Sequence, residues 1–513
     1  MNFPILTVLA LLPAVGAVSL IFLRGALAKQ VALAVSVLVL VLAVIVGLRF
    51  DIGAGMQFTE QARWIAPLGA YYALGLDGIG LTLVLLVAIV TPIVVLASWR
   101  DFDDRAQPAG NLAPRYGGHV FFALVLAVET CALFLFLATD VFLFYVFFEV
   151  ILIPMYFLIG GFGPGRGRTY AAAKNLIFGL LGGFVMLASV IGLYVQSARV
   201  GEPSYLLSTL SQLPLGTGTG RWLFVGFMFA FAIKAPLVPL HTWLPDAAEE
   251  SSPGGAVMMV GVMDKIGTFG MIRFCLGLFP EASQWATPVV LVLAVVSIIY
   301  GAILAIGSRN VMRFIAYTSI SHFGFIVLGI FAFTTQSLVG STLYMLNHGL
   351  STAALFLAAG YLIKRRGSRD IYAYGGVEKT APVLAGLLLF AGLSTLSLPG
   401  LSSFVSEFLV LAGTFSRHPV YATVSTLAVV LAALYILIMY QRTMTGPTRP
   451  DRPVVRDVSR RERLAMAPLV ALILVLGVFP KPMLALIGPA VSATMQHVGV
   501  TDPEPRVSAE GSR

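Results

Sequence analysis

The stretch KAPLVPLHTWLPDAAEESSPGGAVMMVGVMDKIG, residues 234–267, decides how this chain folds. Its first residue, Lys234, ends one apolar run, and Lys265 lies inside the next one. Pro236 and Pro239 cannot donate hydrogen bonds to a helix, and they push the residues before them out of the helical conformation. The stretch therefore predicts a broken helix with free backbone carbonyls beside a lysine in an apolar segment.

The composition on either side of this stretch is that of a polytopic membrane protein. Hydrophobic residues make up 58% of the 513 residues and charged residues only 11%, whereas soluble domains carry roughly a quarter charged residues. A membrane β-barrel would show alternating segments of ~10 residues, which are absent, so the spans are helices. Helical spans need ~20 apolar residues, and we count fourteen: 3–23, 31–48, 79–98, 119–138, 141–161, 171–195, 222–244, 254–278, 288–306, 311–333, 338–363, 382–414, 423–444 and 464–487.

A second proline break predicts an internal repeat. Pro399 and Gly400, in LSLPGLSSFVSEF, lie 163 residues after Pro236, and each break follows a span with a buried polar residue at a similar offset. A repeat of five spans must be inverted in the membrane, and inverted repeats with discontinuous helices are typical of ion transporters. We expect an all-α fold divided into residues 1–115, a first repeat 116–280, an inverted second repeat 281–445, and a final segment 446–513.

Lysine and arginine predict the orientation, because they concentrate in cytoplasmic loops. About 21 of the 33 lie in the odd-numbered loops, so both termini of this multi-pass membrane protein should face outward. The polar tail 502–513 should be disordered. The net charge of +9 is explained by these basic loops, which orient the protein in the membrane. We therefore expect no nucleic-acid partner.

Charged residues inside spans are costly and indicate function. Glu149 is either a switching carboxylate or a packing group bonded to a neighbouring helix. Lys234 lies at a helix C-terminus, where the dipole favours a cation while burial disfavours it, so Glu149 could switch it; the alternative is a static counter-ion. Lys265 is not neutralised by the adjacent Asp264, which points about 100° away, and we expect a hydrated environment for it.

The other titratable residues leave more alternatives. Glu407 follows the second break. Histidine passes protons near neutral pH, so His241, His322 and His348 suggest a proton path, although a hydrogen-bonded packing role or a metal site is also open. The remaining span cations have anchoring or pairing interpretations: Lys174 and Arg273.

No cofactor motif is present in the sequence. It contains no CxxC, Walker A, GxGxxG, HExxH or GxSxG motif, and its two cysteines, Cys131 and Cys275, lie in apolar runs. The glycine-rich GGFGPGRG, 160–167, is interpreted as a tight turn. Neither bound redox cofactors nor ATP-driven chemistry is expected in this chain.

Several long motifs resemble the antiporter-like subunits of respiratory complex I, and among these the M-type chain of bacterial NADH:quinone oxidoreductases. They are residues 234–267, then RNVMRFIAYTSISHFGF, LYMLNHGLSTAALFLAAG and LPGLSSFVSEF. The resemblance implies fourteen core helices in two inverted five-helix repeats. It also implies proton translocation through two half-channels, coupled to quinone reduction elsewhere in a complex whose other membrane subunits are the partners and whose other subunits hold NADH, FMN, iron–sulfur clusters and quinone.

The resemblance also assigns roles. Glu149 and Lys234 would form the charge pair of the first half-channel, Lys265 the central relay and Glu407 the terminal residue of the outward half-channel, with the three histidines on the polar axis. Sister chains usually carry lysine in place of Glu407. The alternatives are a subunit of a cation/proton antiporter or of a membrane-bound hydrogenase or formate-linked complex, and a scaffold that only holds neighbouring pumps together.

Overall fold

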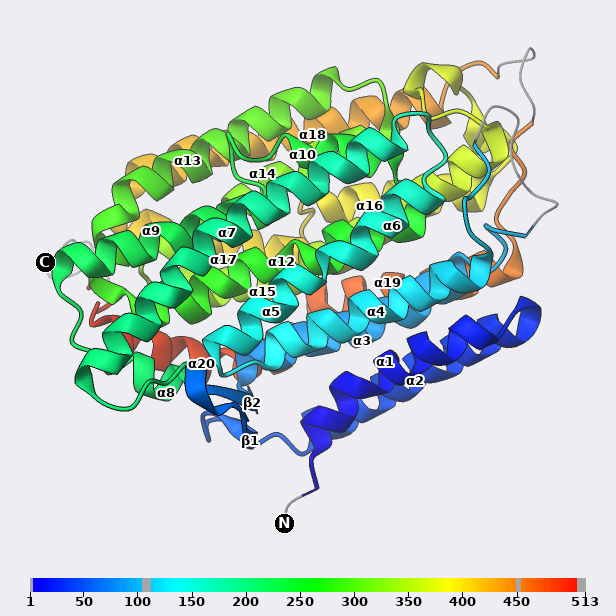
Figure 1. Ribbon diagram of the computed structural model, residues 1–513. Helices are drawn as coiled ribbons and strands as arrows, with labels where there is room; N and C mark the ends of the chain where they lie inside the picture. Colours follow the sequence, from blue (N-terminus) through cyan, green and yellow to red (C-terminus); the bar gives the residue numbers. More distant parts are fainter. Residues whose placement is uncertain (1–2, 104–111, 449–453, 505–513) are drawn as a thin grey trace, which may run out of the picture.

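The computed structural model describes residues 3–103, 112–448 and 454–504. Most of them form helices that run roughly side by side along one direction (Figure 1). The helices of the first half are α1 (Ile5–Phe22), α2 (Gly25–Leu48), α3 (Gly78–Ala97), α4 (Gly118–Leu137), α5 (Val141–Val150), α6 (Leu152–Phe162), α7 (Arg168–Val200), α8 (Leu207–Leu210), α9 (Thr217–Lys234), α10 (Trp243–Glu250), α11 (Pro253–Ala256) and α12 (Lys265–Gly270).

The second half continues the bundle. Its helices are α13 (Pro280–Gly307), α14 (Val311–Phe331), α15 (Thr335–Arg366), α16 (Pro382–Thr395), α17 (Ser402–Arg417), α18 (Pro419–Met444), α19 (Arg460–Val478) and α20 (Lys481–Val498). Two π-helical segments flank α12, η2 (Val257–Met263) and η3 (Met271–Leu276), and three short 3-10 turns lie outside the bundle, η1 (Ala66–Leu68), η4 (Ile371–Ala373) and η5 (Val377–Lys379).

The membrane-spanning prediction is confirmed. Eleven described helices, or up to twelve with a bent pair, are long and apolar enough to cross a membrane. The expected spans 222–244 and 382–414 are each divided into two shorter helices, and this division is consistent with the expected total of fourteen. The expected span 464–487 is wrong at its end, because the chain bends by 71° between α19 and α20, where Pro480 and Pro482 cannot continue the donor ladder.

One element was not predicted. Strands β1 (Gln57–Ile65) and β2 (Ala70–Leu76) form an antiparallel hairpin between α2 and α3. The Glu60 carboxylate accepts hydrogen bonds from the backbone N–H groups of Leu6 and Thr7 at 2.7 and 3.0 Å, which satisfies donors that the first turn of a helix leaves free. The hairpin marks one end of the bundle, here called the hairpin end, where the described part of the chain begins before α1 and ends after α20 (Figure 1).

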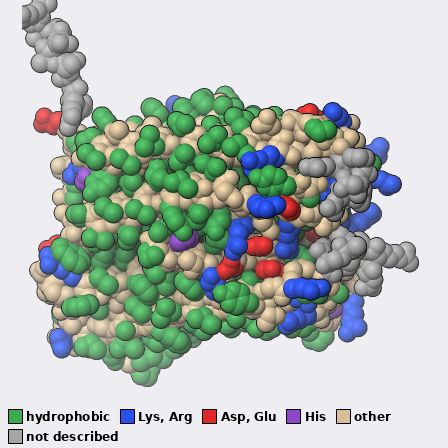
Figure 2. All heavy atoms as spheres, turned by 90° about the horizontal axis from the view of Figure 1, so that it is seen from above, with side chains coloured by type: hydrophobic (Ala, Val, Ile, Leu, Met, Phe, Trp, Pro, Cys, Tyr) green, Lys and Arg blue, Asp and Glu red, His purple; other side chains and the backbone are tan. Residues whose placement is uncertain are grey.

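The opposite end, here called the arginine-rich end, carries the ends of α15 and α18 and the start of α19, with basic clusters such as 364–366. Figure 2 shows a broad apolar face with most of its visible lysine and arginine gathered toward one end. The predicted tail 502–513 lies outside the described residues from 505 onward, and residues 502–504 form no helix or strand. An apolar surface between charged ends is what a bilayer requires.

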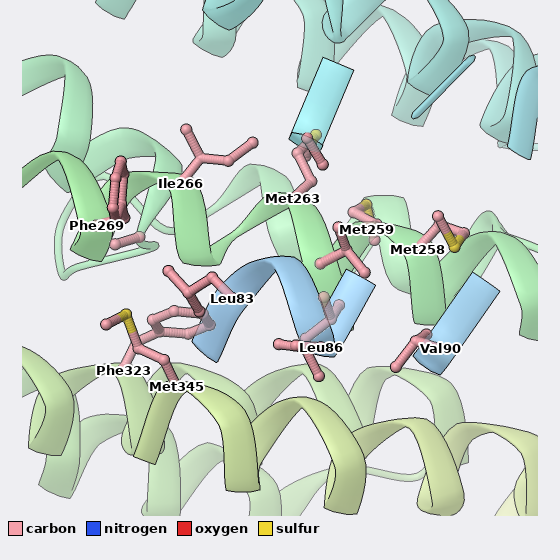
Figure 3. Packing of buried hydrophobic residues seen from close by; sticks show 14 of the residues in the cluster. Leu83, Leu86, Val90, Met258, Met259, Met263, Ile266, Phe269, Phe323 and Met345 are labelled. Carbon is pink, nitrogen blue, oxygen red and sulfur yellow. The ribbon is translucent and has the colours of Figure 1, made fainter. Parts of the chain in front are cut away.

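The core surrounds the segment that carries Lys265. Side chains of α3, η2, α12, α14 and α15 pack closely there (Figure 3), including Leu86, Met259, Phe323 and Met345, all at most 3% exposed. The charged side chains described below are therefore enclosed by apolar groups, where the cost of an unpaired charge is high.

Candidate functional site

The first broken span presents Lys234 in the middle of the bundle. Helix α9 ends at Lys234, Pro236 and Pro239 prevent its continuation, and α10 begins at Trp243. The indole Nε1 of Trp243 donates a hydrogen bond to the carbonyl of Ile233 at 3.0 Å. This bond satisfies a helix-end carbonyl and fixes the two limbs of the break against each other.

The Lys234 ammonium has no hydrogen-bond partner among the described residues, although the side chain is only 2% exposed. It lies over the ring of Phe148, 4.6 Å from the ring centroid. Glu149 and Asp264 are the carboxylates that act on it through charge. Lys234 is thus held by an aromatic face and by distant acids rather than by one fixed ion pair.

Glu149 is half-buried on α5, and its Oε1 atom lacks a hydrogen-bond partner within the described chain. The carboxylate lies against Gly183 of α7, where a Cβ atom would be 1.6 Å from Oε1. Glycine at this position therefore makes room for the acid. Glu149 and Lys234 interact by charge but do not form an ion pair in this structure, and their action as one switch stays a prediction.

Lys265 begins α12 between the two π-helical segments and is fully buried. Its ammonium donates to the carbonyl of Val260 at 2.6 Å and lies 2.7 Å from Nδ1 of His348. An ammonium group can only donate, so with Lys265 charged, Nδ1 of His348 must be the acceptor and the imidazole must be neutral. π-Helical turns recur at functional sites, and here they flank the residue expected to be the central relay.

Asp264 interacts by charge with both Lys234 and Lys265. It is fully buried, neither carboxylate oxygen has a hydrogen-bond partner within the described chain, and both Lys265 and Lys234 act on it through charge. The sequence analysis named it only as a neighbour of Lys265. Its position in an apolar span was a sufficient signal to include it.

A row of polar rings connects Lys265 to the second broken span. The rings of His348 and His322 have centroids 5.3 Å apart, and the centroid of Tyr344 is 5.9 Å from that of His322. All three side chains are at most 4% exposed. The sequence analysis predicted the two histidines but not Tyr344. A tyrosine in an apolar span does not have the large free-energy cost that singles out a charged residue there.

The row ends at Glu407, 6% exposed on α17. Its Oε2 atom accepts hydrogen bonds from the Tyr344 hydroxyl at 2.8 Å and from the Ser397 hydroxyl at 2.5 Å. Ser397 lies in the break between α16 and α17 with φ of 61°, a left-handed conformation uncommon outside glycine. The break predicted from Pro399 and Gly400 thus supplies a donor to the carboxylate.

His241 does not join this row in the described part of the chain. It lies in the first break, 5% exposed, with its ring centroid 5.2 Å from that of Tyr300 on α13. Its Nδ1 atom has no hydrogen-bond partner among the described residues. The structure therefore brings together two of the three predicted histidines.

The two cations with open interpretations are both paired. Arg273 forms an ion pair with Asp77 at 2.8 Å at the hairpin end. Lys174 forms one with Asp246 at 2.6 Å, and Arg313 also contacts that carboxylate. These pairs tie helix ends together near the surface.

One buried acid was missed entirely. Glu129 of α4 is fully buried, and neither of its carboxylate oxygens has a hydrogen-bond partner in the described ranges. The same signal as for Glu149, a glutamate well inside an apolar span, was present in VLAVETCALF. Within the described residues no group of three or more His, Cys, Asp or Glu side chains is placed to hold a metal ion.

Comparisons with known proteins agree with the motifs. The family described as NADH:quinone oxidoreductase/Mrp antiporter, TM, matches residues 138–434. The chain belongs to this family. It is similar to NADH-quinone oxidoreductase subunit M of Mycobacterium tuberculosis, with 51% identity over 99% of this chain and 97% of the relative, and to subunit M of Rhodobacter capsulatus, with 34% identity over 92% and 91%.

Solved structures show the same architecture. A chain of respiratory complex I from Thermus thermophilus with bound NADH superposes with a TM-score of 0.87 and 32% identity, over 96% of this chain and all of that chain. A chain of the Mrp complex from Dietzia sp. has the same fold, with a TM-score of 0.84 at 22% identity. The family resemblance seen in the sequence motifs is confirmed.

Proposed function

We propose that this chain is the proton-translocating M subunit of a bacterial NADH:quinone oxidoreductase. The observation that carries the proposal is the buried row from Lys265 through His348, His322 and Tyr344 to Glu407. Each member can take up and release a proton, and the row lies within an apolar core, where unpaired charges are too costly for a merely structural arrangement.

A proton held at Lys265 can pass to His348, because the ammonium already donates to Nδ1 at 2.7 Å when it is charged. The imidazole releases the proton of its other nitrogen toward His322, since either ring nitrogen can carry it. The Tyr344 hydroxyl, which donates to Glu407 at 2.8 Å, accepts a proton on its oxygen as it gives up its own. Lys265 is then neutral and ready to be recharged from the Lys234 side.

In this proposal Lys234 and Glu149 control that recharging. When the two charges are apart, as here, Lys234 gains least from the carboxylate, and movement of Glu149 toward it favours the charged lysine. His241 is assigned to the entry path because it lies in the same break as Lys234. The energy comes from quinone reduction elsewhere in the complex.

The surroundings follow from the same proposal. Neighbouring antiporter-like chains and other membrane subunits would cover the apolar faces, and lipid would cover the rest. NADH, FMN, iron–sulfur clusters and quinone are assigned to other subunits. The hairpin end, where the described chain begins and ends, would face outward, and the arginine-rich end would face the cytoplasm of a bacterial inner membrane.

Glu407→Gln tests the proposal. Glutamine keeps the shape and accepts the hydrogen bonds from Tyr344 and Ser397, but it cannot titrate. We expect an assembled complex with a strongly reduced proton-to-electron ratio and NADH:quinone rate in sealed vesicles. Glu407→Lys should keep part of the activity, because lysine also carries one proton. Normal pumping by an assembled Glu407→Gln complex would make Glu407 structural.

A further inference from the structure

Asp264 is a buried acid that no step above uses. It is fully buried at the junction of η2 and α12, and neither of its carboxylate oxygens has a hydrogen-bond partner in the described chain. An ionised group without partners is costly in an apolar core, and a neutral side chain of the same size would fill the position at lower cost. The carboxyl group at this position therefore points to a function.

The side of the segment that carries Asp264 faces the end of α9. The backbone N–H of Gly267 donates to the carbonyl of Asp264 at 3.3 Å, and such a three-residue turn places its first and last residues one above the other. A Cβ atom on Gly267 would lie 2.6 Å from the backbone nitrogen of Ala235. Asp264 is therefore on the side of Ala235 and of Lys234, the last residue of α9.

Lys265 points to α15 instead. Its ammonium lies 2.7 Å from Nδ1 of His348, and the hydroxyl of Thr268, three residues further along, donates to the sulfur of Met345 at 2.9 Å. Both partners belong to α15. Adjacent residues of a helix point about 100° apart, so the segment presents Asp264 to the first broken span and Lys265 to the row of polar rings.

Asp264 is the acid that the two lysines share. Both Lys234 and Lys265 act on it by charge. Among the described residues, Asp264 is the one acid that acts on Lys265 by charge, whereas Glu149 also acts on Lys234. While Glu149 is apart, the single carboxylate balances one charged lysine but not two, and an uncompensated charge in an apolar core is costly. The arrangement therefore favours one charged lysine at a time.

We propose that Asp264 carries the proton from Lys234 to Lys265. The carboxylate takes one proton from the Lys234 ammonium, which becomes a neutral amine. It then gives this proton to the neutral Lys265 amine, which becomes an ammonium, and Asp264 is again a carboxylate. The inference rests on the proposed function, because it names the residue that recharges Lys265 from the Lys234 side.

Each stage leaves the three side chains without net charge. At first Lys234 is charged and Asp264 is ionised, then all three groups are neutral, and finally Lys265 is charged and Asp264 is ionised. No stage places an uncompensated charge in the core. The carboxylate makes no hydrogen bond in the described chain that its turning would break, and a water molecule can complete its contact with either lysine.

The test is Asp264→Asn in the assembled complex in sealed vesicles, with Asp264→Ala as a second variant that cannot titrate. Asparagine has the shape of aspartate but carries no charge and takes up no proton near neutral pH. We expect the proton-to-electron ratio and the NADH:quinone rate to fall several-fold in both variants. Asp264→Glu should restore most of both, since it returns the carboxyl group.

Infrared difference spectroscopy separates a proton carrier from a fixed counter-ion. A carboxyl group that takes up a proton during turnover gains the C=O stretching band of a protonated acid. The spectrum of the complex in turnover minus that at rest should contain such a band, and the band should be missing in Asp264→Asn. If the two spectra are the same, Asp264 stays ionised and the proposal is overturned.

Asp140→Asn is the matched control, because Asp140 is a buried aspartate whose carboxylate accepts hydrogen bonds from the backbone N–H groups of Leu143 and Tyr71 at 2.9 and 3.0 Å. Asparagine also caps helices, so this variant should pump normally. Lys265→Met is measured in parallel. If it blocks pumping while Asp264→Asn and Asp264→Ala pump normally, Lys265 is recharged by another route and the inference is overturned. If Lys265→Met itself pumps normally, the fault lies in the proposed function.

Discussion

The two halves of the buried charged row differ in how their members are connected. From Lys265 to Glu407 the side chains follow one another closely: Lys265 and His348 are hydrogen-bonded at 2.7 Å, Tyr344 and Glu407 at 2.8 Å, and the rings between them have centroids 5.3 and 5.9 Å apart. Between Glu149 and Lys234 no such contact exists, and each has an unpartnered polar atom. In this connected row only the rings of His348, His322 and Tyr344 must turn, or bind a bridging water, before a proton can pass, because Nε2 of His348 has no hydrogen-bond partner in the described chain. The separated charges of Glu149 and Lys234 must first approach each other. The difference suggests that the first half is where proton transfer is controlled and the second half where it is carried out.

The largest effect is expected from Lys265→Met, which keeps a long side chain but removes the amine at the head of the connected half. Positioned proton-transfer groups typically contribute about 100-fold or more to a rate, and we expect a loss of that order in proton-coupled quinone reduction, measured in vesicles with quantified assembly. Lys481→Met, at an exposed lysine of α20, is the control. If an assembled Lys265→Met complex still pumped protons, Lys265 would not be the start of the proton path through the connected half.

If Glu149 and Lys234 act together, replacing either residue should strongly reduce proton pumping, and replacing both should reduce it no further. Two opposite unit charges ~4 Å apart attract by about 4 kcal/mol at an effective dielectric of 20, so their approach lowers the energy by that amount and their separation requires it. Glu149→Ala should reduce pumping strongly without loss of assembly. If the two act as one unit, adding Lys234→Ala should lower the pumping rate no further than the worse single variant. Additive losses would show that the two charges work independently.

A smaller effect is expected from Tyr344→Phe, which removes only the hydroxyl between the histidine row and Glu407. Water could replace the hydroxyl, so we expect a several-fold fall in the proton-translocation rate rather than its loss. Tyr361→Phe is a matched control, because Tyr361 is a buried tyrosine of the same helix whose hydroxyl has no partner in the described chain. Equal rates for the two variants would show that the connection at Tyr344 is not used.

The smallest effect is expected from Gly183→Ala in the separated half. The added methyl would lie 1.6 Å from Oε1 of Glu149, so the flexible carboxylate must move away. We expect a modest change in the coupled quinone-reductase rate that disappears in a Glu149→Ala background. Gly386→Ala, where nothing lies within 4 Å of the added Cβ atom, controls for the substitution itself. A change that persists without Glu149 would show that Gly183 acts through helix packing.

The fold could be predicted from the sequence where single residues or short runs have a large effect on the free energy of a membrane helix. Apolar runs of span length and prolines inside them identified the bundle and both breaks, since these features act locally. The bend before α20 was missed because the apolar run continued past Pro480. The hairpin was missed because strands outside the membrane leave no hydropathy signal. The division into residues 1–115, 116–280, 281–445 and 446–513 stays a prediction.

The site was predicted only where a charge stood in an apolar span. Lys265 and Glu407 carry that signal, but Tyr344, which joins the histidine row to Glu407, is unremarkable in sequence. Contacts between side chains of different helices depend on how the helices pack, and the spacing of residues within one segment does not show this. Glu129 and Asp264 had the signal and were passed over, whereas the separation of Glu149 from Lys234 required coordinates.

The π-helical segments on both sides of Lys265 affect the direction in which this side chain points. A π turn, with hydrogen bonds from i to i+5, holds about one residue more than an α turn, and one residue of an α-helix corresponds to about 100° of rotation. If the same residues of η2, Val257–Met263, were wound as a regular α-helix, Lys265 would be turned away from His348. The direction of Lys265 therefore depends on the winding of this segment as well as on its sequence, so a change of winding between α and π would connect or disconnect Lys265 and His348 without moving the helix ends.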